Sequence, residues 1–489
     1  MCIRDRTSGP FILLQQGVAL LVHFAQVVVL SRLLLPSEYG VAAMAASVFS
    51  LSSIFKDFGL STSTLQVQNL DPQDTSNLFW IGLAISVTIA CGTLALGPLV
   101  SYWFDTELVV PLMMGYALVF IISSIGFQPL ALAQRAFRFK ALAIWRITGL
   151  LSGFGVATLL ALYGAGPWAI IGFAMTLETV TMVGAFSISK FVPGRMAHLG
   201  RTKGHLKFGG TLSLGGFLSY VTSNVDRLLI GRLLGAASLG FYTRAQGLLV
   251  LPMSKVLFGF KRFNLATLSR LADKPEEFRS TISRLLRLYL IPCSLFVVPA
   301  AAYADELVAL LMGPKWAAVA PLFVILAPYI WVHVTSMMCF LAHVASADLR
   351  GLTGFYAING IILTGSLLIT IQYGLKTVTI GYCLAGFIGV QTILVFLAGR
   401  RNLINARDFV TNHFWNVLIS AAAFILLKSF RHWLFDSSLP WVDLACGFAI
   451  SVPVMLFLYS LAPQFKDTLR TLIFEAQTVI NKLLHKKRS

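Results

Sequence analysis

The sequence predicts an all-α integral membrane protein of about fourteen transmembrane helices. The 489-residue chain is 57% hydrophobic and only 12% charged, and its mean hydropathy is +0.79. Long apolar runs recur from Phe11 almost to Pro463, with short polar segments between them. Helices cross the hydrocarbon core in runs of about twenty apolar residues, whereas barrel strands alternate over about ten. Helices are therefore the predicted spanning elements.

Charged breaks between the apolar runs set the predicted helix boundaries. The helices are expected at residues 10–35, 39–61, 78–103, 108–133, 142–165, 167–190, 208–234, 239–262, 285–311, 317–345, 352–375, 376–400, 412–430 and 440–462. Lipid leaves no water for unpaired backbone groups, so each run must satisfy its hydrogen bonds internally as a helix.

An internal repeat predicts how these helices are grouped. Ser31-Arg32-Leu33-Leu34, followed by Gly40, recurs about two hundred residues later as Gly231-Arg232-Leu233-Leu234, followed by Gly240. Each copy ends the first helix of a six-helix set. An even number of spans gives both halves the same orientation, an arrangement known in alternating-access carriers. A chance match is the competing explanation, because the R-L-L triplet is common in a Leu-rich chain.

The repeat and the polar segments together divide the chain. We predict a disordered or non-native leader at 1–9, an N-lobe at 10–190, a cytoplasmic linker at 191–207, a C-lobe at 208–400, two further helices at 401–465 and a basic amphipathic cytoplasmic tail at 466–489. The leader MCIRDR resembles neither the rest of the chain nor a cleavable signal peptide.

The distribution of Lys and Arg predicts the orientation. With a cytoplasmic N-terminus, about 26 Lys and Arg fall on the cytoplasmic side and about 6 on the other. The positive-inside rule therefore predicts that both termini are cytoplasmic. The net charge of +18 sits in short loops rather than on one polar domain, so topology explains it better than nucleic-acid binding.

Motifs for catalysis, cofactors and metals are absent from the sequence. None of the six cysteines has a CxxC or Cys/His spacing, so neither a disulfide nor a metal site is expected. We find no DxD, HExxH, GxSxG or Gly-rich phosphate loop. The sequence therefore favours a protein that is not an enzyme and has no cofactor. Because there is no nucleotide-binding motif, a proton or sodium gradient is the expected energy source.

Basic residues inside the predicted spans indicate a binding site, because a charge at membrane depth needs a partner or a wet cavity. Arg227, Arg244 and Lys255 lie in the seventh and eighth predicted helices. Arginine suits bidentate contact with phosphate, and these cations suit a diphosphate. We predict that the three line a cavity between the lobes. Arg32 and Arg232 lie near outer helix ends, where snorkelling explains them.

Three carboxylates at membrane depth are candidates for ion coupling: Asp57, Asp226 and Glu178. Burial raises a carboxyl pKa toward neutrality, so each could accept a proton or hold a cation. Adjacent helix positions point about 100° apart, so Asp226 and Arg227 are not expected to neutralise each other directly. Structural ion pairs between helices are a competing explanation of comparable weight.

Three stretches resemble the polysaccharide-transporter family, the Wzx-type flippases close to the colanic acid exporters. They run from Phe55 to Gln66 (FKDFGLSTSTLQ), from Asn224 to Gly235 (NVDRLLIGRLLG) and from Leu239 to Ala245 (LGFYTRA). The segment LPSEYG at the end of the first helix and the helix count agree with this resemblance, which covers essentially the whole chain. The start of the chain departs from the family pattern.

The resemblance implies the multidrug/oligosaccharidyl-lipid/polysaccharide (MOP) exporter fold, with two six-helix lobes around a central cavity. It implies a flippase that moves undecaprenyl-diphosphate-linked oligosaccharide units to the periplasmic leaflet of the bacterial inner membrane by ion-coupled alternating access. The residue-by-residue match singles out Asp57, Asp226, Arg244 and the loop at Arg232.

Other functions stay open beside this one. A multidrug exporter or a peptidoglycan lipid-precursor exporter would share the fold, and a membrane polymerase or ligase of the same pathway is a further alternative. Interior carboxylates would favour a cation pump, whereas interior Arg and Lys favour a diphosphate carrier. Expected partners are the lipid-linked oligosaccharide and membrane lipids, with the polysaccharide polymerase and chain-length machinery as further candidates.

Overall fold

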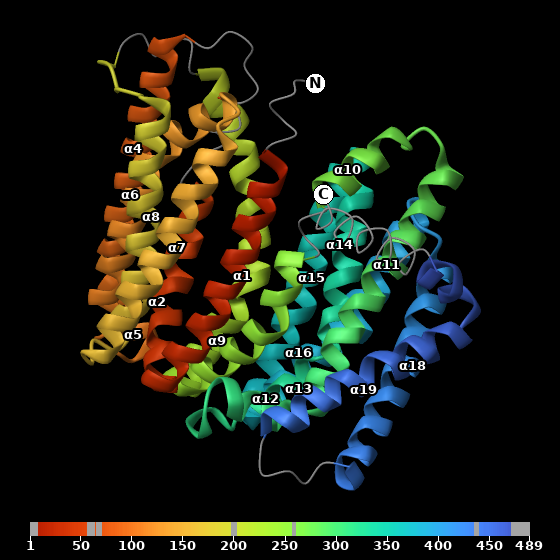
Figure 1. Ribbon diagram of the computed structural model, residues 1–489. Coiled ribbons are helices and arrows are strands. Elements are labelled where there is room, and N and C mark those ends of the chain that lie inside the picture. The colour runs from red at the N-terminus through yellow and green to blue at the C-terminus, as the bar shows by residue number, and fades with distance from the viewer. Residues whose placement is uncertain are drawn as a thin grey trace, which may run out of the picture. The chain divides into compact units, whose positions relative to one another are not determined.

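The computed structural model describes residues 8–55, 64, 71–196, 203–256, 261–434 and 440–470. Within these ranges the regular structure is entirely helical (Figure 1). The helices are α1 (Ser8–Leu33), α2 (Pro36–Phe55), α4 (Pro72–Ala95), α5 (Gly97–Phe104), α6 (Val109–Arg135), α7 (Phe139–Leu162), α8 (Trp168–Ser189), α9 (Lys203–Val256), α10 (Lys261–Arg270), α11 (Pro275–Ala302), α12 (Ala304–Leu311), α13 (Val319–Leu326), α14 (Tyr329–Ala345), α15 (Leu349–Thr370), α16 (Leu375–Leu384), α17 (Gln391–Arg400), α18 (Ala406–Leu434) and α19 (Pro440–Leu461). Short 3-10 turns at Pro314–Trp316 and Ile371–Tyr373 and a π-helical turn at Ala385–Val390 complete the set.

Ten helices among the described residues are long and apolar enough to cross a membrane. Counting α13 and α14, bent by 43° at a short break, as one span gives eleven. The all-helical membrane fold is therefore as predicted, whereas the number of about fourteen stays a prediction. Several predicted helices are divided in the structure: α5 follows α4, and α12 follows α11, after a single intervening residue.

Helix α9 joins two helices that the sequence analysis predicts separately. Its backbone leaves the helical region at Gly235, where φ is 80° and ψ is 175°. A side chain disfavours this positive φ, so glycine suits the break. The first copy of the repeat breaks at the corresponding place, between the end of α1 at Leu33 and the start of α2 at Pro36. The repeated motif therefore marks the same sharp reversal twice.

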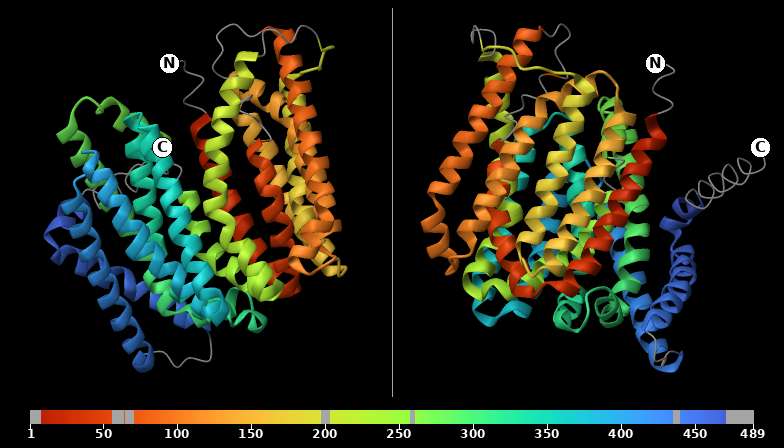
Figure 2. Two further views of the ribbon diagram at one scale, coloured as in Figure 1. Left: turned by 180° about the vertical axis from the view of Figure 1, so that it is seen from behind. Right: turned by 60° about the vertical axis from the view of Figure 1, so that its left-hand side comes forward.

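The chain divides into two compact units, residues 1–243 and 244–489, so the boundary falls inside α9. In the first unit α4, α6, α7 and α8 run side by side as long rods (Figures 1 and 2). Helix α8 packs on both α6 and α7, and α1 packs on α7. Glycines allow these close approaches: a Cβ at Gly115 would lie 2.9 Å from the side chains of Ile171 and Trp168. Small residues at helix contacts are typical of membrane bundles.

In the second unit α11 is the central packing element. It contacts α14, α18 and α19, and α18 also packs on α19. The buried cluster at these contacts includes Tyr303, Met455, Tyr459 and Phe465. Leu469 joins the same cluster, so the first residues of the predicted tail pack on the bundle. The remainder of the tail lies outside the described residues.

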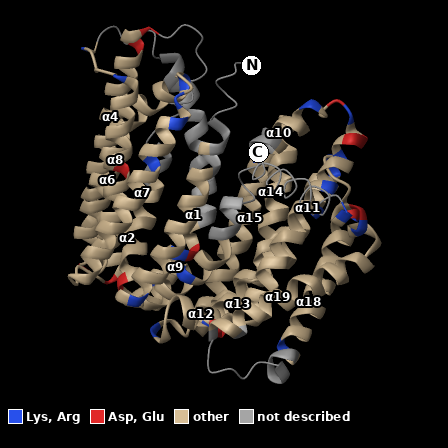
Figure 3. Cartoon of the chain, viewed as in Figure 1, with Lys and Arg blue, Asp and Glu red and all other residues tan. Residues whose placement is uncertain are grey.

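Charged residues lie mainly at the ends of the helices, with long uncharged stretches between them (Figure 3). This pattern follows from the cost of a charge in hydrocarbon. Charged residues within the helices are therefore the first candidates for functional residues.

Candidate functional site

Asp226 lies in α9 and is buried, with 3% of its surface exposed. Its Oδ2 accepts a hydrogen bond from the Tyr242 hydroxyl at 2.9 Å, and its Oδ1 accepts one from the Arg227 backbone N–H at 2.8 Å. Asp226 and Tyr242 lie on opposite sides of the break at Gly235, so their bond ties the two legs of α9 together. Asp226 was predicted from the sequence as a candidate, whereas Tyr242 was not.

Arg227 is half-buried beside this carboxylate. Its Nη1 donates to Asn224 Oδ1 at 3.2 Å. Its Nε is buried and has no hydrogen-bond partner among the described residues. A buried donor without a partner is costly unless water or a ligand accepts from it. Arg227 therefore keeps hydrogen-bonding capacity that the described residues do not use.

The other predicted cations are placed as follows. Arg244 is half-buried in α9 and belongs to the second unit, whereas Arg227 belongs to the first. Lys255 lies near the end of α9, but its side chain is outside the described residues, and Asp57 is outside them altogether. The convergence of Arg227, Arg244 and Lys255 on one cavity stays a prediction.

Glu178 in α8 lies in a polar cluster between three helices. Its Oε1 is 3.6 Å from Arg146 Nη1, and its Oε2 accepts from the Ser123 hydroxyl at 2.9 Å. The same Arg146 nitrogen donates to Thr181 Oγ1 at 3.5 Å. Arg146 was not among the predicted residues, although it is a charge several residues inside a predicted span. Glu178 is therefore a carboxylate with a cationic partner within its own unit.

Arg232 lies on an aromatic surface at the turn in α9. Its guanidinium carbon is 6.0 Å from the ring centre of Tyr102 and 5.9 Å from that of Trp103, and its Nη1 donates to the Tyr102 carbonyl at 3.4 Å. Aromatic rings with a basic residue are typical of the membrane–water interface. The setting agrees with the expectation that Arg232 snorkels to the headgroups.

A buried network of neutral polar groups lies in the second unit. Asn416 Oδ1 accepts from the Tyr459 hydroxyl at 2.6 Å and from the Ser294 hydroxyl at 3.0 Å. Trp331 Nε1 donates to Ser294 Oγ at 3.0 Å. These four residues come from α11, α14, α18 and α19, so their hydrogen bonds link the four helices. They were not predicted from the sequence, since a single neutral polar residue in an apolar run carries little signal.

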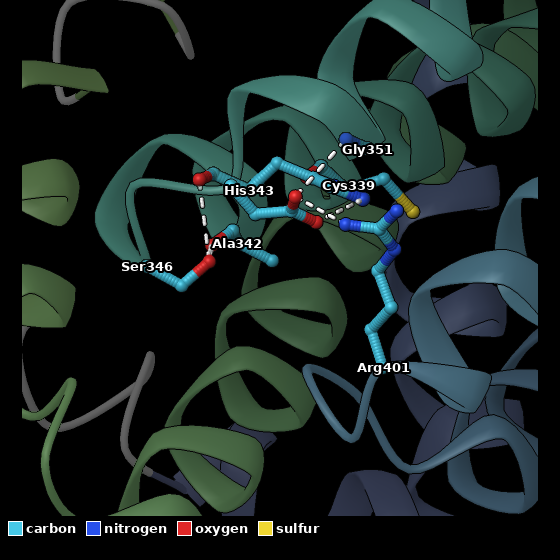
Figure 4. A network of polar contacts seen from close by, with 7 residues as sticks. Cys339, Ala342, His343, Ser346, Gly351 and Arg401 are labelled. Atoms are coloured by element: carbon cyan, nitrogen blue, oxygen red, sulfur yellow. Dashed lines mark hydrogen bonds and ion pairs between the residues drawn. The ribbon is translucent and has the colours of Figure 1, made fainter.

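Asp348 links α14, α15 and the end of α17. It caps α15 by accepting from the Gly351 N–H at 3.0 Å, forms an ion pair with Arg401, and lies 3.8 Å from His343 Nε2. Figure 4 shows Arg401 reaching toward the helix that carries His343. Burial opposes ionisation of Asp348. The hydrogen bonds from Gly351 and Arg401, with the charges of Arg401 and His343, outweigh burial and lower its pKa.

Metal ligands do not cluster in the part of the chain that the structure describes: no group of three or more His, Cys, Asp or Glu there could hold a metal ion. The five cysteines described are free thiols. The polar clusters above offer hydrogen bonds and charge.

Residues 29–321 match the family described as polysaccharide biosynthesis protein. The chain belongs to this family. Two curated relatives show the extent of the similarity. An uncharacterized membrane protein in the cps region of Klebsiella pneumoniae is 28% identical over 62% of this chain and 63% of its own length. The lipopolysaccharide biosynthesis protein WzxC of Escherichia coli (strain K12) is 22% identical over 67% of each chain. The matched segment thus spans about two thirds of these relatives.

Two solved structures resemble this family member over most of its length. The lipid II flippase MurJ, in an inward closed conformation, has a TM-score of 0.69 at 12% identity and covers 93% of this chain and 98% of its own. An inward-facing multidrug resistance MATE family transporter of the MOP superfamily has a TM-score of 0.56 at 15% identity, over 79% of this chain and 94% of its own. At such low identity the likeness establishes the fold alone, which is of the MOP type. The predicted fold class is confirmed to that extent.

Proposed function

We propose that this protein is a flippase that moves undecaprenyl-diphosphate-linked oligosaccharide units from the cytoplasmic to the periplasmic leaflet. The observation that carries the proposal is the match to the polysaccharide biosynthesis family over residues 29–321. A relative named succinoglycan biosynthesis transport protein ExoT, from Rhizobium meliloti (strain 1021), is 23% identical over 63% of this chain and 62% of its own length. Transport is therefore named among its relatives, and the MOP-type fold suits that role.

The mechanism we propose is alternating access by two six-helix lobes, with fourteen spans in all and both termini in the cytoplasm. Arg227 supports it, because its Nε is buried without a partner among the described residues and suits a phosphate oxygen. Arg244 and Lys255 would complete a basic lining for the diphosphate. The lipid tail would stay in the bilayer, so no covalent reaction is needed.

A proton or sodium gradient is the proposed energy source. Asp226 and Glu178 are the described candidates for coupling, since each is a carboxylate within a membrane bundle that hydrogen-bonds to a neighbouring hydroxyl. Protonation of either would weaken its local hydrogen bonds and ion pairs and so favour a different packing.

The decisive experiment is reconstitution of the purified protein in liposomes with a fluorescent lipid-diphosphate oligosaccharide. The expected result is movement of the lipid between leaflets that accelerates when an ion gradient is imposed. Arg227→Gln should slow it about tenfold or more, because a charge-assisted hydrogen bond to phosphate is lost. No movement under any ion gradient would refute the proposal.

A lipid-precursor or multidrug exporter of the same fold is the second candidate, favoured by the likeness to MurJ and the MATE transporter. A deletion strain separates the candidates. Accumulation of lipid-linked polysaccharide units in the cytoplasmic leaflet supports the first function. Accumulation of the peptidoglycan lipid precursor, or sensitivity to cationic drugs with normal surface polysaccharide, supports the second.

A further inference from the structure

A groove of about 740 Å³ lies in the second unit, where the ends of three helices meet. Its walls are the first turn of α11, the last turn of α17 and the start of α18. Four charged residues line it: Glu276, Arg279, Arg400 and Asp408. The groove is distinct from the α9 site described above, and nothing in the proposed translocation step requires it.

One of the four charges already has a charged neighbour, because Asp408 interacts electrostatically with Arg287 of α11. None of them forms an ion pair with another residue in the described ranges. Arg400 lies over the Phe396 ring, with 5.6 Å between the guanidinium carbon and the ring centre. Glu276 and Asp408 lie in the first turns of α11 and α18, where the helix dipoles stabilise negative charge. The groove therefore presents two cations and two anions together.

The loop between α17 and α18 contributes Asn402, Ile404 and Asn405 to the lining of the groove. Asn402 has a left-handed backbone with φ of 56°, and its N–H donates to the Gly399 carbonyl at 2.9 Å. The Leu403 N–H donates to the Ala398 carbonyl at 3.0 Å, which completes a capping turn of the kind that ends helices. Arg401, between Arg400 and Asn402, does not line the groove and forms an ion pair with Asp348. These backbone hydrogen bonds define the conformation of the loop beside the groove.

Exposed apolar side chains lie on two of the helices that form the groove, α17 and α18. Phe396, one turn before the end of α17, is 57% exposed. On α18, Val410 and Phe414 share a helix face beyond Asp408 and are 62% and 61% exposed. Both helices belong to segments apolar enough to span the membrane. A ligand with a polar head in the groove could therefore keep its apolar tail in the hydrocarbon.

We propose that this groove binds the head group of a zwitterionic phospholipid of the ethanolamine class. Arg279 and Arg400 would hold the phosphate, and Glu276 and Asp408 would accept hydrogen bonds from the primary ammonium. An anionic phospholipid without an ammonium leaves both carboxylates unpaired beside a phosphate. A choline head carries the same charges but has no N–H to donate, so it satisfies the carboxylates less well.

The test is lipid binding to the purified full-length protein in detergent, by native mass spectrometry and by thermal unfolding. The three probes are phosphatidylethanolamine, phosphatidylcholine and phosphatidylglycerol with identical acyl chains. We expect the ethanolamine lipid to bind on the order of tenfold more tightly than either of the others and to raise the melting temperature most. Equal binding of the ethanolamine and choline lipids would overturn the proposal.

Matched variants locate the site. Arg400→Gln and Glu276→Gln should abolish the preference for ethanolamine. Arg407→Gln and Glu277→Gln make the same charge changes at neighbouring exposed positions outside the groove and should keep it. Equal effects of a groove variant and its control would overturn the proposal. The melting temperature of each variant is first compared with that of wild type in lipid-free detergent. If one groove variant does not fold, the other still tests the proposal. Lipid binding is measured without transport, so its outcome is separate from that of the proposed function.

Discussion

Gly40 and Gly240 occupy equivalent positions in the two copies of the repeat, and each packs against the other copy. A side chain at Gly40 would overlap the carbonyl of Ala236, and one at Gly240 would overlap the carbonyl of Pro36. Residues 36 and 236 are themselves equivalent under the offset of two hundred residues. The contact is therefore reciprocal, as in an interface with two-fold symmetry. The repeat seen in the sequence has a structural counterpart within the first unit.

This contact should not tolerate larger side chains. We expect Gly40→Leu or Gly240→Leu to destabilise the protein by roughly 1–3 kcal/mol or more, because backbone atoms block the added volume. The measurement is thermal unfolding in detergent, together with restoration of surface polysaccharide in a deletion strain. Gly155→Leu is the control, since a Cβ there meets nothing within 4 Å. Equal melting temperatures for all three variants would contradict the prediction.

The Asp226–Tyr242 bond should stabilise the turn in α9. Tyr242→Phe removes the donor and leaves Asp226 Oδ2 with less hydrogen bonding in a buried site, which costs about 1–3 kcal/mol. We expect a lower melting temperature and slower lipid translocation. Tyr163→Phe, at a tyrosine that is 87% exposed, is the control for loss of a hydroxyl. A Tyr242→Phe protein as stable and active as wild type would show that the bond is dispensable.

Glu178 and Arg146 should be energetically coupled. Each single variant, Glu178→Gln or Arg146→Gln, leaves one charge in the bundle without its partner, whereas the double variant leaves none. We expect the losses in free energy of unfolding of the two single variants to sum to more than the loss in the double variant, by about 0.5–3 kcal/mol. Unfolding of all four proteins in detergent measures this difference. Strict additivity would mean that the separation of 3.6 Å reflects proximity without coupling.

The Asp348–Arg401 pair should make stability depend on acid pH. The pKa of Asp348 is lowered from its ordinary value of 3.8, so the folded state favours the carboxylate. Its contribution is complete above that ordinary value and is lost as the pH falls through the lowered pKa. Asp348→Asn should therefore be less stable than wild type at neutral pH by no more than about 1 kcal/mol, since Arg401 is half-exposed.

Melting curves of wild type and Asp348→Asn from neutral to strongly acidic pH check this sign. The difference in melting temperature between the two proteins should disappear only at the acid end of this range. Asp467→Asn, at an exposed carboxylate whose side chain is 91% accessible, should show a smaller gap throughout. A gap for Asp348→Asn that widens as the pH falls would contradict the assignment.

The candidate site was only partly predictable from sequence. A charge inside an apolar run stands out, so Asp226, Glu178 and Arg227 could be selected. Their partners could not, because Tyr242 and Ser123 are ordinary in such a composition. The Asn416 network was missed for the same reason. Arg146 carried the necessary signal, a charge within a predicted span, and was overlooked.

The sequence by itself determined that the chain is a helical membrane protein and where most of its spans lie. The reason is that the hydrocarbon core fixes both the length and the apolar character of any segment that crosses it. The sequence also contains the repeat, since the same reversal of the chain needs the same short motif twice. Only the tertiary structure decided which faces of the helices meet. A helix that is apolar all round has no preferred side, so the pairing of Glu178 with Arg146, of Asp226 with Tyr242 and of Gly40 with Ala236 depends on packing between segments far apart in the chain.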